Sequence, residues 1–254
     1  MLSRDLVEKV ARRAIRPIWD DMKVRALQCS ARAGEMSDGH SADEKSASAN
    51  YPGATVTIDR LKKYVDAHPG EVEINLVSHS AGSIYSVGVL ARMQDAGLKV
   101  HNLVFLAPAI RVCDYQMFIA PKLSAKMIDK VAIFNLSEYF EENDLSSIKG
   151  IAYPHSLLYL VARALESPGV WGIRGTSAFT RYAACSNKPL SVISDATPAD
   201  VLKSNMAVVV NSSSSASKEQ SKEASSRLAS TATSHGGFGD DRATLESIAL
   251  LLQQ

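Results

Sequence analysis

The residue best placed to do chemistry is Ser80, in the run Ser78-His79-Ser80-Ala81-Gly82. Residues 72–77 are a short apolar and β-branched run, as in a strand, whereas apolar residues recur at helical spacing after residue 82. A serine on the tight turn between strand and helix would be open to attack on a substrate, and the small Ala81 and Gly82 would let the helix pack back on the strand. The pattern predicts a nucleophile; the alternative is a Ser80 that only N-caps the helix.

This segment resembles the α/β-hydrolase superfamily, in particular serine esterases and lipases, whose nucleophile turn reads G-x-S-x-G. Ser78 stands where that pattern has its first glycine. The resemblance implies that Ser80 is the nucleophile and that the amide of Ala81 is an oxyanion donor. It also implies a chain order of nucleophile, acid and histidine, and hydrolysis of a small-molecule carboxylic ester through an acyl-enzyme.

A serine hydroxyl needs a neighbouring imidazole to take its proton. His235, in SHGGFGDD, follows the last predicted strand, where the resemblance expects the histidine, and we predicted that Gly236 and Gly237 allow the backbone turn that aims its ring. The alternative base is His155, in YPHSLL. It would stand at a helix N-terminus, where the helix dipole disfavours the imidazolium form. His235 could also be an ordinary surface histidine.

The imidazole needs an acid to orient it, and an acidic loop, EYFEENDL, follows the third predicted strand. Asp144 is the predicted acid, because an aspartate several residues beyond the strand can reach across to a histidine. Glu138, closest to the strand end, is the alternative acid, and Glu141 and Glu142 belong to the same cluster. The cluster could equally be a solvated acidic turn.

Alternating strands and helices predict an α/β fold whose sheet is mostly parallel, with flanking helices. The predicted strands are 72–77, 103–107, 131–137 and 206–211, and the predicted helices are 3–28, 55–68, 155–166 and a last helix capped by Asp240 or Asp241. Apolar residues between 110 and 119 could receive an acyl group or pack in the core.

The chain divides at about residue 70. Residues 1–70 are predicted to be helical, with a flexible loop at 31–52, and residues 71–254 form the α/β-hydrolase-like core, with a flexible serine-rich loop at 211–234. The resembled superfamily places several strands before the nucleophile, so the chain is interpreted as shortened on its N-terminal side. Strand 72–77 would then be a sheet edge and Ala81 the only nameable oxyanion donor. The alternative function is a non-catalytic binding or assembly protein.

The composition of the chain narrows the classes of partner that it could bind. The 254 residues include 28 Lys and Arg against 27 Asp and Glu, a net charge of +1, which offers no global attraction for nucleic acid. No apolar stretch reaches the roughly 18–20 residues of a membrane span, and the start lacks a secretory signal, so we expect a cytoplasmic location. Neither the three separated cysteines nor any motif predicts a metal or nucleotide cofactor. The oligomeric state is left open.

Overall fold

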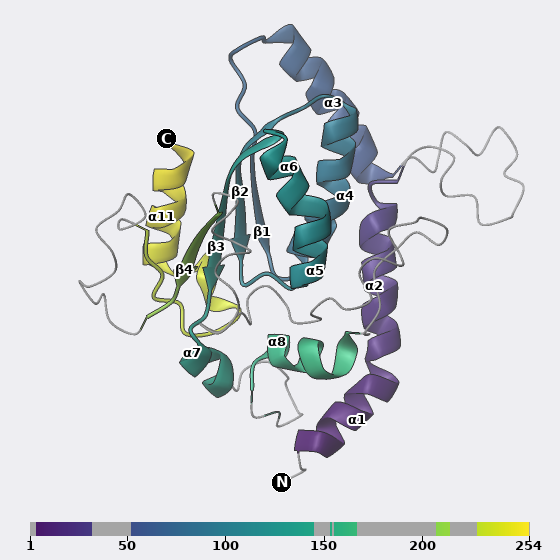
Figure 1. The fold of residues 1–254 in the computed structure, drawn as a ribbon, viewed down its shortest axis with the longest axis vertical. Coiled ribbons are helices and arrows are strands. Elements are labelled where there is room, and N and C mark those ends of the chain that lie inside the picture. Colours follow the sequence, from purple (N-terminus) through teal and green to yellow (C-terminus); the bar gives the residue numbers. More distant parts are fainter. Residues whose placement is uncertain are drawn as a thin grey trace, which may run out of the picture.

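A computed structural model describes residues 4–31, 52–144, 153, 155–166, 207–213 and 228–253. At its centre is a four-stranded sheet in the order β1-β2-β3-β4, with every neighbouring pair parallel (Figure 1). The strands are β1 (Asn75–His79), β2 (Val100–Leu106), β3 (Ile128–Asn135) and β4 (Ala207–Asn211). The predicted α/β class, with a parallel sheet and flanking helices, is confirmed.

The strand boundaries differ from prediction where polar residues are buried. The strand β2 begins at Val100 rather than at residue 103, and Asn102 within it is only 2% exposed. Its side-chain amide donates to Asn75 Oδ1 at 2.8 Å and to the carbonyl of Leu251 at 3.1 Å. Because these bonds satisfy both hydrogens of the amide nitrogen, an asparagine can occupy a strand that the apolar pattern excluded.

The helices cover both faces of the sheet. The helix α4 (Gly82–Asp95) joins β1 to β2, and α5 (Val112–Asp114), the π-helical turn η1 (Tyr115–Ile119) and α6 (Ala120–Ser124) join β2 to β3. Right-handed crossovers between strands in sequential order put these connections on one face. The last helix, α11 (Arg242–Leu252), packs on the other face (Figure 1), and Asp241 caps it by accepting from the amide of Thr244, as predicted.

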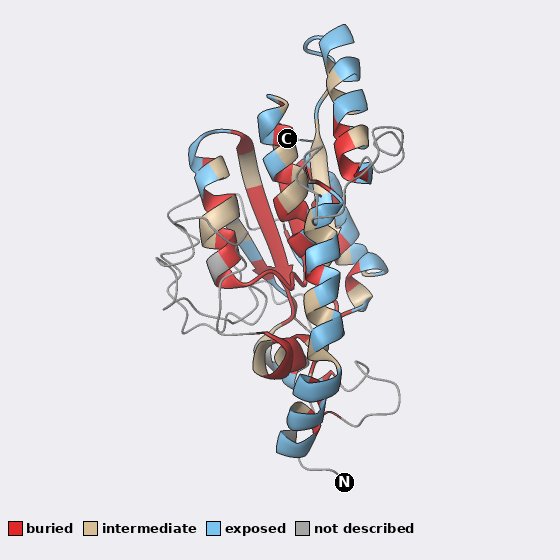
Figure 2. Cartoon of the chain, turned by 90° about the vertical axis from the view of Figure 1, so that its right-hand side faces the viewer, coloured by how far each residue is buried: buried red, intermediate tan, exposed pale blue. Residues whose placement is uncertain are grey.

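Three helices precede the sheet: α1 (Arg4–Ala14), α2 (Arg16–Gln28) and α3 (Gly53–Ala67). The predicted helix over 3–28 is therefore divided at Ile15, with Pro17 in the first turn of α2, where its missing N–H costs nothing. The helix α2 approaches α4 closely at Gly88, where an added Cβ would lie 1.9 Å from Ser30 Oγ. Figure 2 shows burial concentrated on the sheet, with α1 largely exposed.

Between β3 and β4 lie α7 (Glu138–Asn143), α8 (Leu157–Leu160) and the π-helical turn η2 (Val161–Leu165). The helix predicted over 155–166 therefore begins at Leu157 and changes to a π turn after one α turn. Together α8 and η2 pack on α1 through a second apolar cluster: Val7, Ala11, Tyr153, Leu160, Val161, Ala164 and Leu165. The Tyr153 hydroxyl also donates to Glu8 Oε1 on α1 at 2.9 Å.

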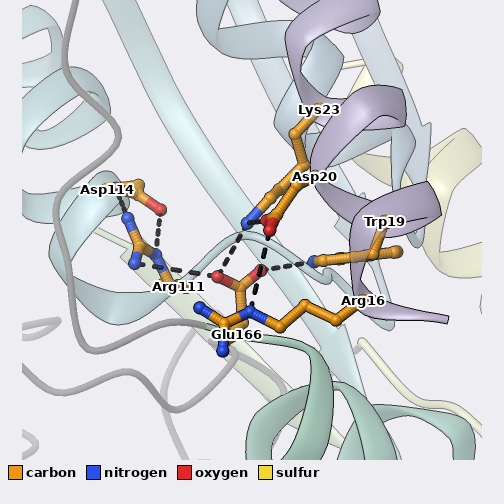
Figure 3. Close-up of polar contacts among 7 residues, drawn as sticks. All are labelled: Arg16, Trp19, Asp20, Lys23, Arg111, Asp114 and Glu166. Atoms are coloured by element: carbon orange, nitrogen blue, oxygen red, sulfur yellow. Dashed lines mark hydrogen bonds and ion pairs between the residues drawn. The ribbon is translucent and has the colours of Figure 1, made fainter. Parts of the chain in front are cut away.

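The two clusters are joined by a buried charge network around Glu166 (Figure 3). The Glu166 side chain, 1% exposed, accepts from Trp19 Nε1 at 2.7 Å and from Lys23 Nζ at 3.0 Å, both on α2. Arg111 Nη1, in the loop after β2, lies 3.7 Å from Glu166 Oε2, and the same guanidinium binds both oxygens of Asp114. These bonds hold α2 and the end of η2 against the carboxyl edge of the sheet.

Most of the predicted flexible loops at 31–52 and 211–234 lie outside the described residues, as do residues 167–206. Among the helices that are described, none has the length and apolar character to cross a membrane.

Replacing Glu166 by alanine should lower the free energy of unfolding by about 3 kcal/mol or more, because Lys23 and Arg111 would remain buried without their shared anion. Glu246→Ala is the control, since its pair with Arg242 is exposed and should contribute less than about 0.5 kcal/mol. Urea unfolding followed by circular dichroism measures both. Equal, small losses would show that the network does not stabilise the fold.

Candidate active site

Ser80 immediately follows β1 and has a backbone φ of +52°, in the left-handed region. A residue with a Cβ is strained there, so its surroundings must hold it. The Ser80 amide donates to the carbonyl of Leu106 at 2.9 Å, and the Ser80 carbonyl accepts from Ala109 N at 3.1 Å and Ser83 Oγ at 2.6 Å. The ends of β1 and β2 and the start of α4 thus fix the turn from three sides.

The Ser80 hydroxyl faces an imidazole. Its Oγ lies 2.8 Å from Nε2 of His235, a residue 155 positions later in the chain. The N-cap residue of α4 is Ala81, with no side-chain capping bond. Ser80 therefore does not N-cap the helix, and its Oγ is positioned to give a proton to Nε2.

Ser78, the departure from the glycine pattern, is accommodated by a hydrogen bond. Its Oγ lies 2.6 Å from Ser86 Oγ on α4. A Cβ added at Gly82 would meet Ser78 Cβ at 3.5 Å, an ordinary contact distance. An alanine would therefore also fit at Gly82, where the sequence predicted only that a small residue is needed.

His235 is 9% exposed and is held by two bonds to its backbone. Asp144 Oδ2 accepts from the His235 amide at 2.8 Å, and His79 Nε2 donates to the His235 carbonyl at 2.8 Å. Gly236 has φ −83°, and the left-handed glycines of the described chain are Gly70 and Gly97. Gly236 thus needs no left-handed backbone, whereas a Cβ added at Gly237 would lie only 3.0 Å from Ser234 Oγ.

The environment keeps this imidazole neutral. The pKa of His235 is lowered to about 4, first because burial disfavours the imidazolium and second because His79 lies nearby, with ring centroids 5.1 Å apart. The negative charge of Asp144 opposes both effects. The other ring nitrogen, Nδ1, is buried and has no hydrogen-bond partner among the described residues. At neutral pH the ring can accept a proton at Nε2.

Asp144 ends α7 and is 4% exposed. The structure thus brings together the three residues predicted as nucleophile, base and acid, although Asp144 contacts the backbone of His235 rather than its Nδ1. Glu138, the alternative acid, begins α7, and its side chain lies outside the described part of the structure. The alternative base, His155, packs its ring against Tyr153 and Tyr159.

The amide of Ala81 stands at the N-terminus of α4, where helix amides have no intrahelical acceptor. No hydrogen bond to it occurs within the described part of the chain. Of the apolar residues considered for an acyl site, Ile110, Val112, Tyr115 and Ile119 lie in the hydrophobic core and are each 6% exposed or less, whereas Met117 and Phe118 are half-buried. The described residues contain no group of three or more His, Cys, Asp or Glu arranged to hold a metal ion.

Two contacts of the site were not predicted. His79, inside the turn, donates from Nε2 to the carbonyl of His235. Glu141, one of four carboxylates in the acidic loop, is 2% exposed and binds Ser156 at the start of α8. The only signal in the sequence that distinguishes Glu141 from its neighbours is its spacing of three residues from Asp144, which in a helix would put both on one face.

No protein-family model matches the chain, and neither the curated proteins nor the solved structures contain a match to it. The function is therefore argued from the geometry of the site.

Because Ser80 has a left-handed backbone, Ser80→Gly should be more stable than Ser80→Ala by about 0.5 to 1 kcal/mol, the relieved strain less the extra freedom of an unfolded glycine. At Ala67, on the exposed end of α3, glycine should instead be less stable than alanine. Chemical denaturation of the three variants and the native protein measures the differences. If Ser80→Ala were the more stable of its pair, the turn would not be strained.

Below about pH 4, the rate at which Ser80 reacts with a fluorophosphonate should fall roughly tenfold per pH unit, because Nε2 of His235 must be unprotonated to accept the proton. His79→Gln should move this loss to higher pH, since His79 lowers the pKa of His235. His68→Gln, distant on α3, is the control. If the labelling rate of the native protein instead fell on acidification with a midpoint near pH 6.5, a buried, neutral His235 would be contradicted.

Proposed function

We propose that the chain is a serine hydrolase of the α/β-hydrolase type that cleaves carboxylic esters through an acyl-enzyme. The observation that carries the proposal is the 2.8 Å approach of Ser80 Oγ to His235 Nε2, at a left-handed residue on the carboxyl end of a parallel strand. A strained serine that directs its hydroxyl to a buried neutral imidazole is the arrangement that activates an alcohol as a nucleophile.

In the proposed reaction Ser80 Oγ attacks the ester carbonyl while its proton passes to His235 Nε2. The carbonyl oxygen of the tetrahedral intermediate, now negative, receives a hydrogen bond from the amide of Ala81, aided by the helix dipole of α4. The carbon–oxygen bond to the alcohol then breaks, and Nε2 returns the proton to the leaving oxygen. Water repeats these steps on the acyl-enzyme, with His235 again as base, and frees Ser80.

Asp144 has two tasks in this proposal. Its bond to the His235 amide fixes the loop that carries the imidazole, and its negative charge stabilises the imidazolium formed when Nε2 is protonated. Its charge is needed because burial and His79 both disfavour that imidazolium. The order Ser80, Asp144 and His235, after β1, β3 and β4 respectively, also supports the resemblance to α/β-hydrolases.

A second candidate is a non-catalytic, hydrolase-like binding or assembly protein. The observation in its favour is the orphaned Nδ1 of His235, which in the described structure lacks the carboxylate contact that would fix the imidazole tautomer. Ala81 is also the only oxyanion donor that we assign. A lost donor of this kind costs on the order of a hundred-fold or more in rate.

Fluorophosphonate labelling, with the modified peptide located by mass spectrometry, separates the two candidates. The hydrolase should be labelled at Ser80, and Ser80→Ala and His235→Ala should each abolish labelling and the hydrolysis of p-nitrophenyl esters of graded chain length. Asp144→Asn keeps an oxygen for the His235 amide but removes the charge, so turnover should fall by on the order of 10³- to 10⁴-fold.

Ser234→Ala, next to the base, is the control and should leave turnover unchanged. Folding of every variant is checked by circular dichroism. If the native protein is folded but Ser80 is not labelled, the hydrolase proposal is contradicted and the binding protein becomes the better candidate.

A further inference from the structure

A second buried carboxyl group lies one helical turn before Asp144. Glu141 and Asp144 are 2% and 4% exposed; Glu141 lies in the last turn of α7 and Asp144 is the C-cap residue of that helix. Asp144 has the amide of His235 as a donor, whereas Glu141 has no role in the proposed reaction. Burying a carboxyl group next to another acid costs free energy, so the contacts that Glu141 makes indicate its role.

The contacts of Glu141 are with Ser156, the N-cap residue of α8. The Ser156 amide donates to the Glu141 carbonyl at 2.8 Å, and Ser156 Oγ donates to Glu141 Oε2. The same Ser156 Oγ accepts from the amide of Tyr159 in the first turn of α8. One glutamate therefore joins the loop that carries Asp144 to the start of the α8 and η2 segment, whose other end is fixed by Glu166.

The charges around Glu141 favour its neutral form. Its Oε1 is buried and lacks a hydrogen-bond partner among the described residues, and within that part of the chain no cation pairs with Glu141 as Lys23 and Arg111 do with Glu166. Burial raises the pKa of Glu141 to about 7; the Ser156 bond lowers this pKa, and the negative Asp144 raises it. The other titratable side chains of α7 belong to Glu138, Tyr139 and the exposed Glu142, and those of residues 155–166 belong to His155, Tyr159, Arg163 and Glu166.

We propose that Glu141 is a positioning residue that, as a neutral carboxylic acid, holds Asp144 and the start of α8 together. The inference rests on the proposed function of the site. A neutral Glu141 adds no negative charge next to Asp144. An ionised Glu141 would put a second, unpaired negative charge one turn away, and repulsion would displace Asp144 from the His235 amide.

The test compares Glu141→Gln, which stays neutral at every pH, with Glu142→Gln, an exposed neighbour on the same helix. In the native protein and in Glu142→Gln, fluorophosphonate labelling of Ser80 should fall roughly tenfold between pH 6 and pH 8, as Glu141 ionises. In Glu141→Gln the rate at pH 6 should stay within about twofold of native and should not fall at pH 8. An unaltered alkaline loss in Glu141→Gln, or a loss of labelling at pH 6, would overturn the proposal.

Stability gives a readout that does not depend on hydrolysis. A carboxyl group whose pKa is raised by folding stabilises the native state below its unfolded pKa and loses that contribution as pH rises through the folded value. The unfolding midpoint of the native protein should thus fall relative to Glu141→Gln between pH 4.5 and pH 7, and amide exchange in 155–166 should quicken. If Ser80 is never labelled but this pH-dependent difference in stability appears, the proposed hydrolase function is wrong and the role of Glu141 is supported. If the unfolding midpoints of the two proteins change with pH in parallel, the proposed role of Glu141 is wrong.

Discussion

The common direction of the four strands is the constraint on which the candidate site depends. Because all pairs in the sheet are parallel, the carboxyl ends of β1, β3 and β4 meet at one edge, and the segments that leave them are brought together. Ser80 and His235 are 155 positions apart in the chain yet 2.8 Å apart in space for this reason. An antiparallel pairing of β4 would send the segment after it to the opposite edge.

Buried carboxyl groups at this edge have different partners and hence different roles. Glu166 is paired with Lys23 and lies near Arg111, so its charge joins helices to the sheet. Asp144 accepts from the His235 amide, and its negative charge raises the pKa of the imidazole. Glu141 accepts from the Ser156 hydroxyl, and burial raises its pKa to about 7. All three carboxyl groups are buried, so they are distinguished by the groups that each one contacts.

The sequence predicted what depends on short-range patterns. Each strand appeared within about three residues of its expected position, Asp241 caps the last helix, and the residues expected at the carboxyl edge lie there. The start of β2 was missed because Asn102 is polar, and its burial depends on Asn75 and Leu251, which no local pattern reveals. The bond from Lys23 to Glu166 spans 143 positions and was equally invisible.

The turn at Ser80 shows how these levels combine. Local sequence explains a strand, a small-residue turn and a helix, but not why a serine accepts φ +52°. The cost is offset by bonds from β2 and its following loop, through Leu106 and Ala109, so the strain is maintained by the neighbouring strand. That loop continues to Arg111 and the Glu166 network. The contacts that hold the N-terminal helices against the sheet therefore also support the turn at Ser80, through β2. Weakening these contacts should also destabilise the turn.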